Sequence, residues 1–65
     1  MNLSDAIKTA VKENDGGLAF RCAEALYQKG YTPEKVYKLA NKLTGVNRNT
    51  WENLVEFGKI IKKVG

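Results

Sequence analysis

The sequence predicts an all-α fold, a small domain of four helices. Apolar residues recur at a spacing of three to four in four segments of similar length, and turn signals separate these segments. No segment shows the strict alternation of apolar and polar residues that is typical of a half-buried strand. At 65 residues the chain has the length of one domain and contains no repeat or linker, so we expect residues 1–65 to fold as a single helical domain.

The first two segments each carry an apolar stripe, and an Asn-Asp-Gly-Gly turn at residues 14–17 separates them. Ser4 is the expected N-cap of the first helix. The stripe of the first helix comprises Leu3, Ile7, Ala10 and Val11. The stripe of the second helix comprises Ala19, Cys22, Ala23 and Leu26. Because both stripes repeat at helical spacing, both segments are expected to pack inward as amphipathic helices.

The third and fourth segments begin at recognisable capping residues. Thr32 is the expected N-cap of the third helix, with Pro33 at its first position, and Asn49 is the expected N-cap of the fourth. The third helix is expected to bury Val36, Leu39, Ala40 and Leu43. The fourth segment is apolar over more than half of its circumference, through Trp51, Leu54, Val55, Phe57, Gly58, Ile60 and Ile61. We expect such a helix either to lie in the middle of the bundle or to bury its spare face against a second molecule.

Composition narrows the classes of function. The chain has one Cys and no His, so it lacks the usual general base and the usual ligands of structural zinc, and we expect no catalytic residue, no metal site and no cofactor. A domain of this size also has little room for the enclosed cleft of a small-molecule substrate. No stretch approaches the ~20 apolar residues that cross a bilayer, so no membrane partner is expected. A lone Cys that cannot close an internal disulfide is typical of a cytoplasmic protein.

The net charge of +4 comes from the C-terminal half, because acids and bases cancel over residues 1–33. Lys35, Lys38 and Lys42 recur at i, i+3 and i+7 on the third helix, opposite its apolar stripe. Such a stripe can bind phosphates, since each neutralised phosphate releases condensed counterions. The alternative is that these lysines only keep the outer face of the helix solvated, and their spacing is consistent with both.

Residues 33–56 read as a helix, a tight turn and a second helix. The pattern that they form resembles the helix-turn-helix of phage repressor and Cro-like DNA-binding proteins, through Leu39-Ala40, Leu43, Gly45-Val46 and Thr50-Trp51. Gly45 can supply a positive φ where the first helix ends, and Val46 can fill the angle between the helices. The resemblance implies a small non-enzymatic regulator whose second helix exposes Asn47, Arg48, Asn49, Glu52, Asn53 and Glu56.

On this hypothesis the residues that bind DNA are Lys35, Lys38, Lys42, Asn47, Arg48, Asn49 and Asn53. An Asn side chain can pair with the edge of adenine and an Arg side chain with that of guanine, while the lysines hold flanking phosphates. We expect a homodimer, because one such unit buries too little DNA surface for tight specific recognition.

The alternative hypothesis is a protein-binding module or inhibitor that docks an aromatic-rich helical surface on a partner protein or on a second copy of itself. The chain has six aromatic residues, more than one small core easily encloses, and aromatic side chains are favoured interface anchors. The interface candidates are Tyr31, Tyr37 and Phe57, of which Tyr37 is expected to point away from the apolar stripe of its helix.

Overall fold

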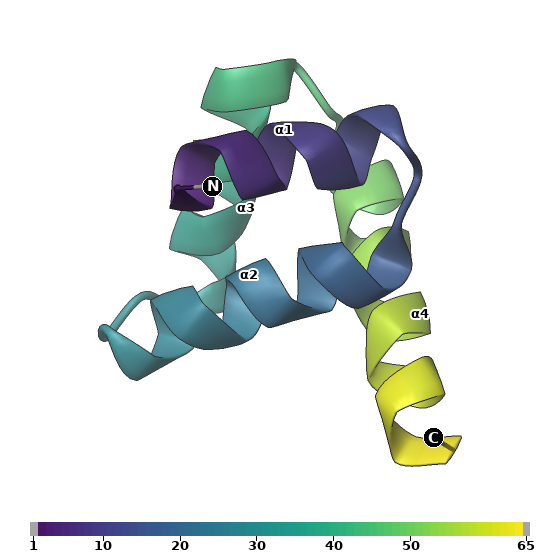
Figure 1. Ribbon diagram of the computed structural model, residues 1–65. Helices are drawn as coiled ribbons and strands as arrows, with labels where there is room; N and C mark the ends of the chain where they lie inside the picture. The colour runs from purple at the N-terminus through teal and green to yellow at the C-terminus, as the bar shows by residue number, and fades with distance from the viewer. Residues whose placement is uncertain (1, 65) are drawn as a thin grey trace.

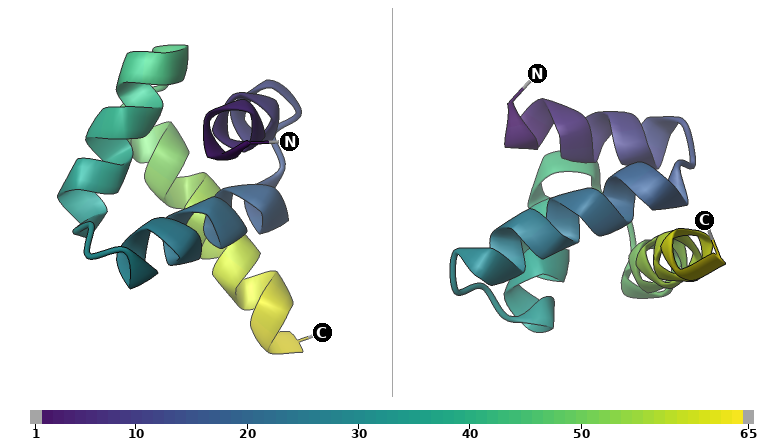
Figure 2. Two further views of the ribbon diagram at one scale, coloured as in Figure 1. Left: turned by 60° about the vertical axis from the view of Figure 1, so that its left-hand side comes forward. Right: turned by 60° about the horizontal axis from the view of Figure 1, so that its bottom comes forward.

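A computed structural model describes the backbone of residues 2–64 and the side chains of residues 2–62. Over this range the chain forms four helices and no strand, which confirms the predicted all-α fold. The helices are α1 (Leu3–Lys12), α2 (Gly16–Gln28), α3 (Pro33–Thr44) and α4 (Arg48–Val64). Figure 1 shows that α4 passes the N-terminal end of α2, while α3 follows from the C-terminal end of α2. The last turns of α4 extend past the other helices in the left view of Figure 2.

Side-chain caps fix where the first three helices begin. The Asn2 Oδ1 accepts a hydrogen bond of 2.8 Å from the Asp5 amide, so Asn2 caps α1. The prediction that Ser4 caps this helix is therefore wrong, because Asn2 already satisfies the first free amide and Ser4 lies inside the first turn. The Thr32 Oγ1 accepts from the Lys35 amide at 3.3 Å, which confirms the predicted cap of α3.

The start of α4 lies two residues earlier than the sequence predicted. The Asn47 Oδ1 accepts a hydrogen bond of 2.8 Å from the Thr50 amide, so Asn47 takes the capping role predicted for Asn49. The reason lies in the preceding turn. Gly45 ends α3 with a φ of 78°, which confirms the positive φ predicted for it, and Val46 is buried. Because the direction of the backbone has changed by Val46, α4 can begin directly after Asn47.

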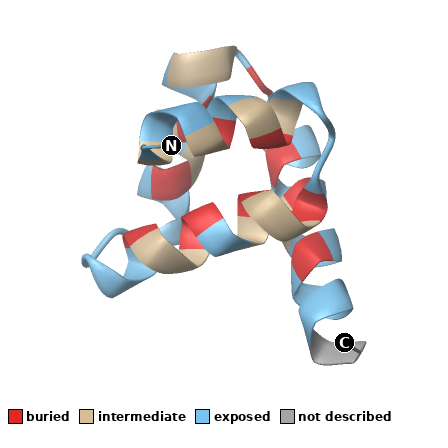
Figure 3. Cartoon of the chain, in the orientation of Figure 1, coloured by how far each residue is buried: buried red, intermediate tan, exposed pale blue. Residues whose placement is uncertain are grey.

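The buried core draws on all four helices and on the turn before α4. Its members are Ile7, Ala10, Ala19, Cys22, Ala23, Leu26, Val36, Ala40, Val46, Trp51 and Leu54. The buried positions in Figure 3 face the space that the helices enclose. Most members of the four predicted stripes are in this set, and Leu3, Val11, Leu39 and Leu43 pack at its edge. Many of the core side chains are small, which lets the helix backbones approach closely.

The closest approach joins the start of α2 to the middle of α4. A Cβ atom placed on Gly58 would lie 2.0 Å from the carbonyl oxygen of Gly16. A Cβ atom on Gly16 would lie 2.8 Å from the carbonyl oxygen of Leu54. The two backbones therefore touch at a glycine pair, and α4 packs more extensively on α2 than on α3. Within the described part of the chain, no helix is long and apolar enough to span a membrane.

Candidate nucleic-acid interface

The turn between α3 and α4 comprises residues 45–47 and is held by side chains of α3. The Asn41 Nδ2 donates a hydrogen bond of 2.9 Å to the carbonyl oxygen of Val46. The Thr44 hydroxyl donates to the carbonyl oxygen of Ala40 at 2.8 Å and accepts from the Val46 amide at 3.1 Å. These hydrogen bonds fix both the amide and the carbonyl group of Val46. The first turns of α4 therefore have a defined position relative to the end of α3.

The polar side of α4 is exposed, as the sequence predicted. The exposed residues of this side are Asn47, Arg48, Asn49, Glu52, Asn53 and Glu56. The Asn47 side-chain oxygen is engaged in the helix cap, so only its amide nitrogen remains to donate to a ligand. Asn49 and Asn53 lie one turn apart on the same side of the helix and present whole amide groups.

Arg48 does not extend freely from α4. Its Nη2 donates a hydrogen bond of 2.8 Å to the Glu34 Oε1, and its guanidinium carbon lies 4.7 Å from the centre of the Tyr37 ring. The hydrogen bond to Glu34 raises the pKa of Arg48, with a smaller contribution from the charge of that carboxylate. The guanidinium therefore ties the start of α4 to α3. Sequence reasoning missed this pairing because Glu34 lies on another helix, and no local pattern connects the two residues.

The three candidate lysines of α3, which we call the lysine stripe, are all exposed. Lys38 lies one turn beyond Glu34 on the same side of α3, and Lys42 lies one turn beyond Lys38. Since Glu34 contacts Arg48, Lys38 lies one helical turn from the residue that touches the first turn of α4. Lys35 instead lines a hollow with Lys29, Gly30 and Tyr31 at the turn between α2 and α3.

The three aromatic candidates do not form one surface. Tyr37 is half-buried against the core and lies beneath Arg48, so the expectation that it points away from the packed side of α3 is wrong. Tyr31 is 40% exposed and lines a hollow with Lys29 and Lys35. Phe57 lines a different hollow on α4 that shares no residue with the first. Tyr31 follows the end of α2, whereas Gly58, the neighbour of Phe57, contacts Gly16 at the start of α2. About 20 Å of helix, at about 1.5 Å per residue, therefore separates Tyr31 from this contact.

Part of α4 is both apolar and exposed, and its burial against a second molecule stays a prediction. Phe57 is 58% exposed, Ile60 52% and Ile61 48%. We call these three residues the apolar face. Of the two expectations for α4, burial in the middle of the bundle is wrong, because the core closes around Trp51 and Leu54 on one side of the helix only.

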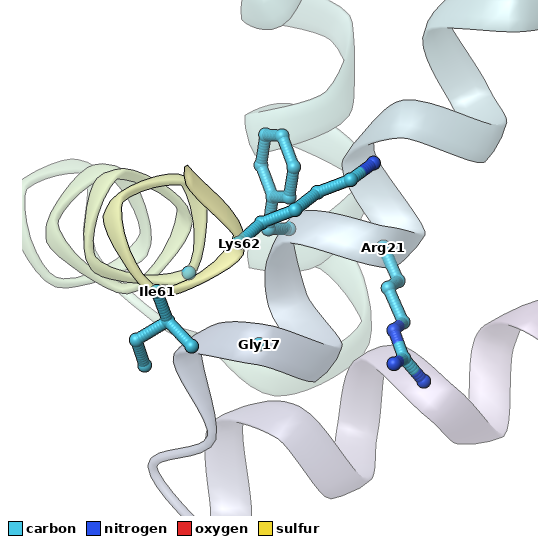
Figure 4. Close-up of a pocket in the computed structure, with 6 residues that line it drawn as sticks. Gly17, Arg21, Ile61 and Lys62 are labelled. Carbon is cyan, nitrogen blue, oxygen red and sulfur yellow. The ribbon is translucent and has the colours of Figure 1, made fainter. Parts of the chain in front are cut away.

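A hollow of about 410 Å³ lies beside Ile61, between α2 and α4. It is bounded by Gly17, Phe20, Arg21, Gly58, Ile61 and Lys62. Figure 4 shows the Arg21 side chain extending toward α1, away from Ile61. The Lys62 Nζ is held by the Glu24 Oε1 at 2.8 Å and lies 5.4 Å from the centre of the Phe20 ring. Its charge is therefore already paired within the chain.

The one cysteine has the environment of a core residue. Cys22 is buried, and this burial raises the pKa of its thiol. A thiol with a raised pKa keeps its proton at neutral pH and is a poor nucleophile. Among the described residues, no three side chains of the metal-binding types lie together.

No protein-family model matches the chain, and no match was found among curated proteins or among solved structures.

Proposed function

We propose that this protein binds DNA through the lysine stripe of α3 and the first turns of α4. The observation that carries the proposal is the position of the stripe. Three exposed lysines lie on successive turns of α3, and Arg48 ties this helix to the start of α4, which presents exposed amides. Lysines in such a row can follow a phosphate backbone, and side-chain amides at a helix start can reach base edges in the major groove.

The proposal assigns different tasks to the polar residues of α4. Asn49 and Asn53 are the base-reading residues, because an amide can donate and accept at the edge of adenine. Arg48 acts chiefly as a positioning residue, because its guanidinium is occupied by Glu34. Glu52 and Glu56 repel phosphate, which confines phosphate contacts to α3, and Glu52 can accept a hydrogen bond from cytosine.

A charge-matched pair of variants tests the proposal. Lys38→Glu reverses a charge in the lysine stripe, and Lys8→Glu makes the same change on the exposed surface of α1. Both variants alter the net charge equally, so a general electrostatic effect lowers DNA affinity equally in both. We expect Lys38→Glu to weaken binding at least tenfold on all sequences and to flatten the salt dependence, while Lys8→Glu changes affinity less than threefold. Equal effects of the two variants contradict the proposal.

A second candidate function is docking onto a partner protein, and the exposure of Phe57, Ile60 and Ile61 favours it. Under this function Lys38→Glu leaves the affinity for the partner nearly unchanged, while Phe57→Ala weakens it. Phe57 is a better probe than Tyr37, because Tyr37 packs against the core and its truncation also lowers stability.

A further inference from the structure

A hollow of about 340 Å³ lies at the turn between α2 and α3, at the edge of the molecule away from the last turns of α4 (Figures 1 and 2). Its lining residues are Lys29, Gly30, Tyr31 and Lys35, and all four are exposed. Lys29 and Tyr31 precede residues 33–56, so the helix-turn-helix resemblance assigns them no role. The hollow combines two lysines with an aromatic ring that is 40% exposed.

The backbone on both sides of Tyr31 is fixed. The Gly30 amide donates a hydrogen bond of 2.9 Å to the Tyr27 carbonyl oxygen, and the Tyr31 amide donates one of 3.0 Å to the Leu26 carbonyl oxygen. Gly30 has the positive φ, 99°, that this ending of a helix requires. Thr32 follows at once and caps α3. An exposed ring on such a fixed backbone can bind a flat ligand at a small cost in conformational entropy.

The two lysines of the hollow carry positive charges that the chain does not neutralise. Within the described residues, neither Lys29 nor Lys35 forms an ion pair. Glu34, the neighbour of Lys35, binds Arg48 instead. The dipole of α3 is positive at this end of the helix and adds to the potential. Two ammonium groups beside an aromatic ring fit a ligand that has both phosphate and a flat ring, and a nucleotide has both.

The lysine stripe leads to this hollow, because Lys35 belongs to both. Lys35 and Lys42 are about 10 Å apart along α3, at about 1.5 Å per residue. A DNA strand advances about 3.4 Å per nucleotide along its axis, so a strand that follows the stripe reaches the hollow within about three nucleotides. In a duplex both faces of each base are covered by its neighbours. A base can therefore stack on Tyr31 only where the strand continues unpaired.

We infer that the hollow binds an unpaired nucleotide of the DNA strand that the lysine stripe holds. Its base stacks on the Tyr31 ring, and Lys29 and Lys35 hold the flanking phosphates. The inference rests on the proposed function and adds a preference to it: the protein binds a junction between duplex and single strand more tightly than a blunt duplex. Because stacking on an aromatic ring accepts every base, the preference is for the unpaired strand and not for a base sequence.

Fluorescence anisotropy with three kinds of labelled DNA tests the inference. The probes are a blunt duplex, the same duplex with a short run of unpaired thymidines at its 5′ or 3′ end, and the single strand alone. We expect the wild type to bind one of the overhang duplexes roughly tenfold more tightly than the blunt duplex, which is within the range that stacking of one base supplies. Equal affinities for blunt and overhang duplexes overturn the inference and leave the proposed function standing.

The single strand separates the two proposals in the other direction. Binding to the single strand without binding to the blunt duplex refutes the proposed function and leaves the nucleotide site standing. No binding to any of the three probes overturns both. A free nucleotide lacks the neighbouring phosphates that the lysine stripe holds, so thymidine monophosphate is expected to compete only weakly. Competition by thymidine monophosphate as strong as that by the single strand assigns the hollow to a free nucleotide and overturns the inference.

Substitutions at Tyr31 test the stacking. Tyr31→Leu removes the ring and is expected to abolish the preference for the overhang while the affinity for the blunt duplex changes less than threefold, which also shows that the variant is folded. Tyr31→Phe keeps a ring and is expected to keep the preference. Phe57→Leu is the matched control, because it removes an exposed ring outside the hollow. A preference that survives Tyr31→Leu, or that Phe57→Leu removes equally, overturns the inference.

Lys29→Gln tests the contact with phosphate. We expect this variant to reduce the slope of log affinity against log salt by roughly 0.7–0.9 on the overhang duplex, which is the contribution of one phosphate. The slope on the blunt duplex is expected to stay unchanged. Lys8→Gln, on the exposed surface of α1, makes the same change of charge and is expected to alter neither slope. An equal effect of Lys29→Gln on both duplexes, or of Lys8→Gln on the overhang duplex, contradicts the inference.

Discussion

Substituting Gly58 by Ala is expected to destabilise the fold, although the same change stabilises most helices. In an ordinary helix interior, replacing Gly by Ala gains about 1 kcal/mol. Here the added Cβ lies 2.0 Å from the Gly16 carbonyl oxygen and 2.7 Å from the Phe20 Cβ. None of these atoms is the end of a flexible side chain, so α2 and α4 must separate.

The magnitude follows from two opposing terms. Separating packed elements typically costs about 1–3 kcal/mol and sometimes more, and the overlap at Gly58 is severe enough for the upper end of that range. After the gain in helix propensity, we expect a net loss of about 2 kcal/mol. For a domain of this size, such a loss lowers the Tm by roughly 8–16 °C.

Gly17→Ala is the matched control. Gly17 is also a helical glycine, in α2, but the nearest atom to its added Cβ is the Asp15 Oδ1 at 3.5 Å, which is ordinary contact. This variant is expected to raise the free energy of unfolding by up to about 1 kcal/mol. Thermal unfolding followed by circular dichroism measures both variants. If the Tm of Gly58→Ala matches or exceeds that of the wild type, the close contact of Gly58 with Gly16 and the position of α4 on α2 are wrong.

Further predictions concern the caps, the core and the dependence on pH. Asn47→Ala removes the cap of α4 and is expected to lower the free energy of unfolding in urea by about 1 kcal/mol, whereas Ser4→Ala, which removes no cap, leaves it unchanged within error. Because Trp51 is buried, its fluorescence emission is expected to shift to longer wavelength on unfolding, and an emission maximum that does not move contradicts its burial. The pKa of Cys22 is raised in the folded state, so the folded protein keeps a proton that the unfolded chain loses, and stability is full at neutral pH and falls as the pH rises through the thiol range. The urea midpoint against pH measures this effect, and Cys22→Ala is expected to remove it.

Local patterns were sufficient to predict the helices and most of the core. Pro33 after Thr32 marks the start of α3, and the spacing from Val36 to Ala40 marks its buried side, because capping and helical periodicity depend only on nearby residues. The caps of α1 and α4 were misplaced by two residues each. In both cases two polar residues near the helix start are suitable N-caps, and the path of the preceding backbone determines which of them caps the helix.

The candidate site depended more on contacts between helices. The sequence predicted that the lysine stripe and the polar side of α4 are exposed, because helical periodicity shows on which side of its helix each residue lies. It did not predict that Glu34 holds Arg48, nor that Tyr37 packs beneath the guanidinium, because both contacts require the angle between α3 and α4. Gly58 inside a helix was a usable signal, since a glycine there often marks a close approach of backbones, but it does not name Gly16 as the partner.

The proposed function requires that the lysine stripe binds the phosphates of DNA. Fluorescence anisotropy of a labelled mixed-sequence duplex, titrated with the wild-type protein at several salt concentrations, measures this binding. We expect micromolar binding whose log affinity falls against log salt with a slope of about −3 or steeper, as contact with three or more phosphates requires. No binding at low salt, or binding that does not respond to salt, refutes the proposed function.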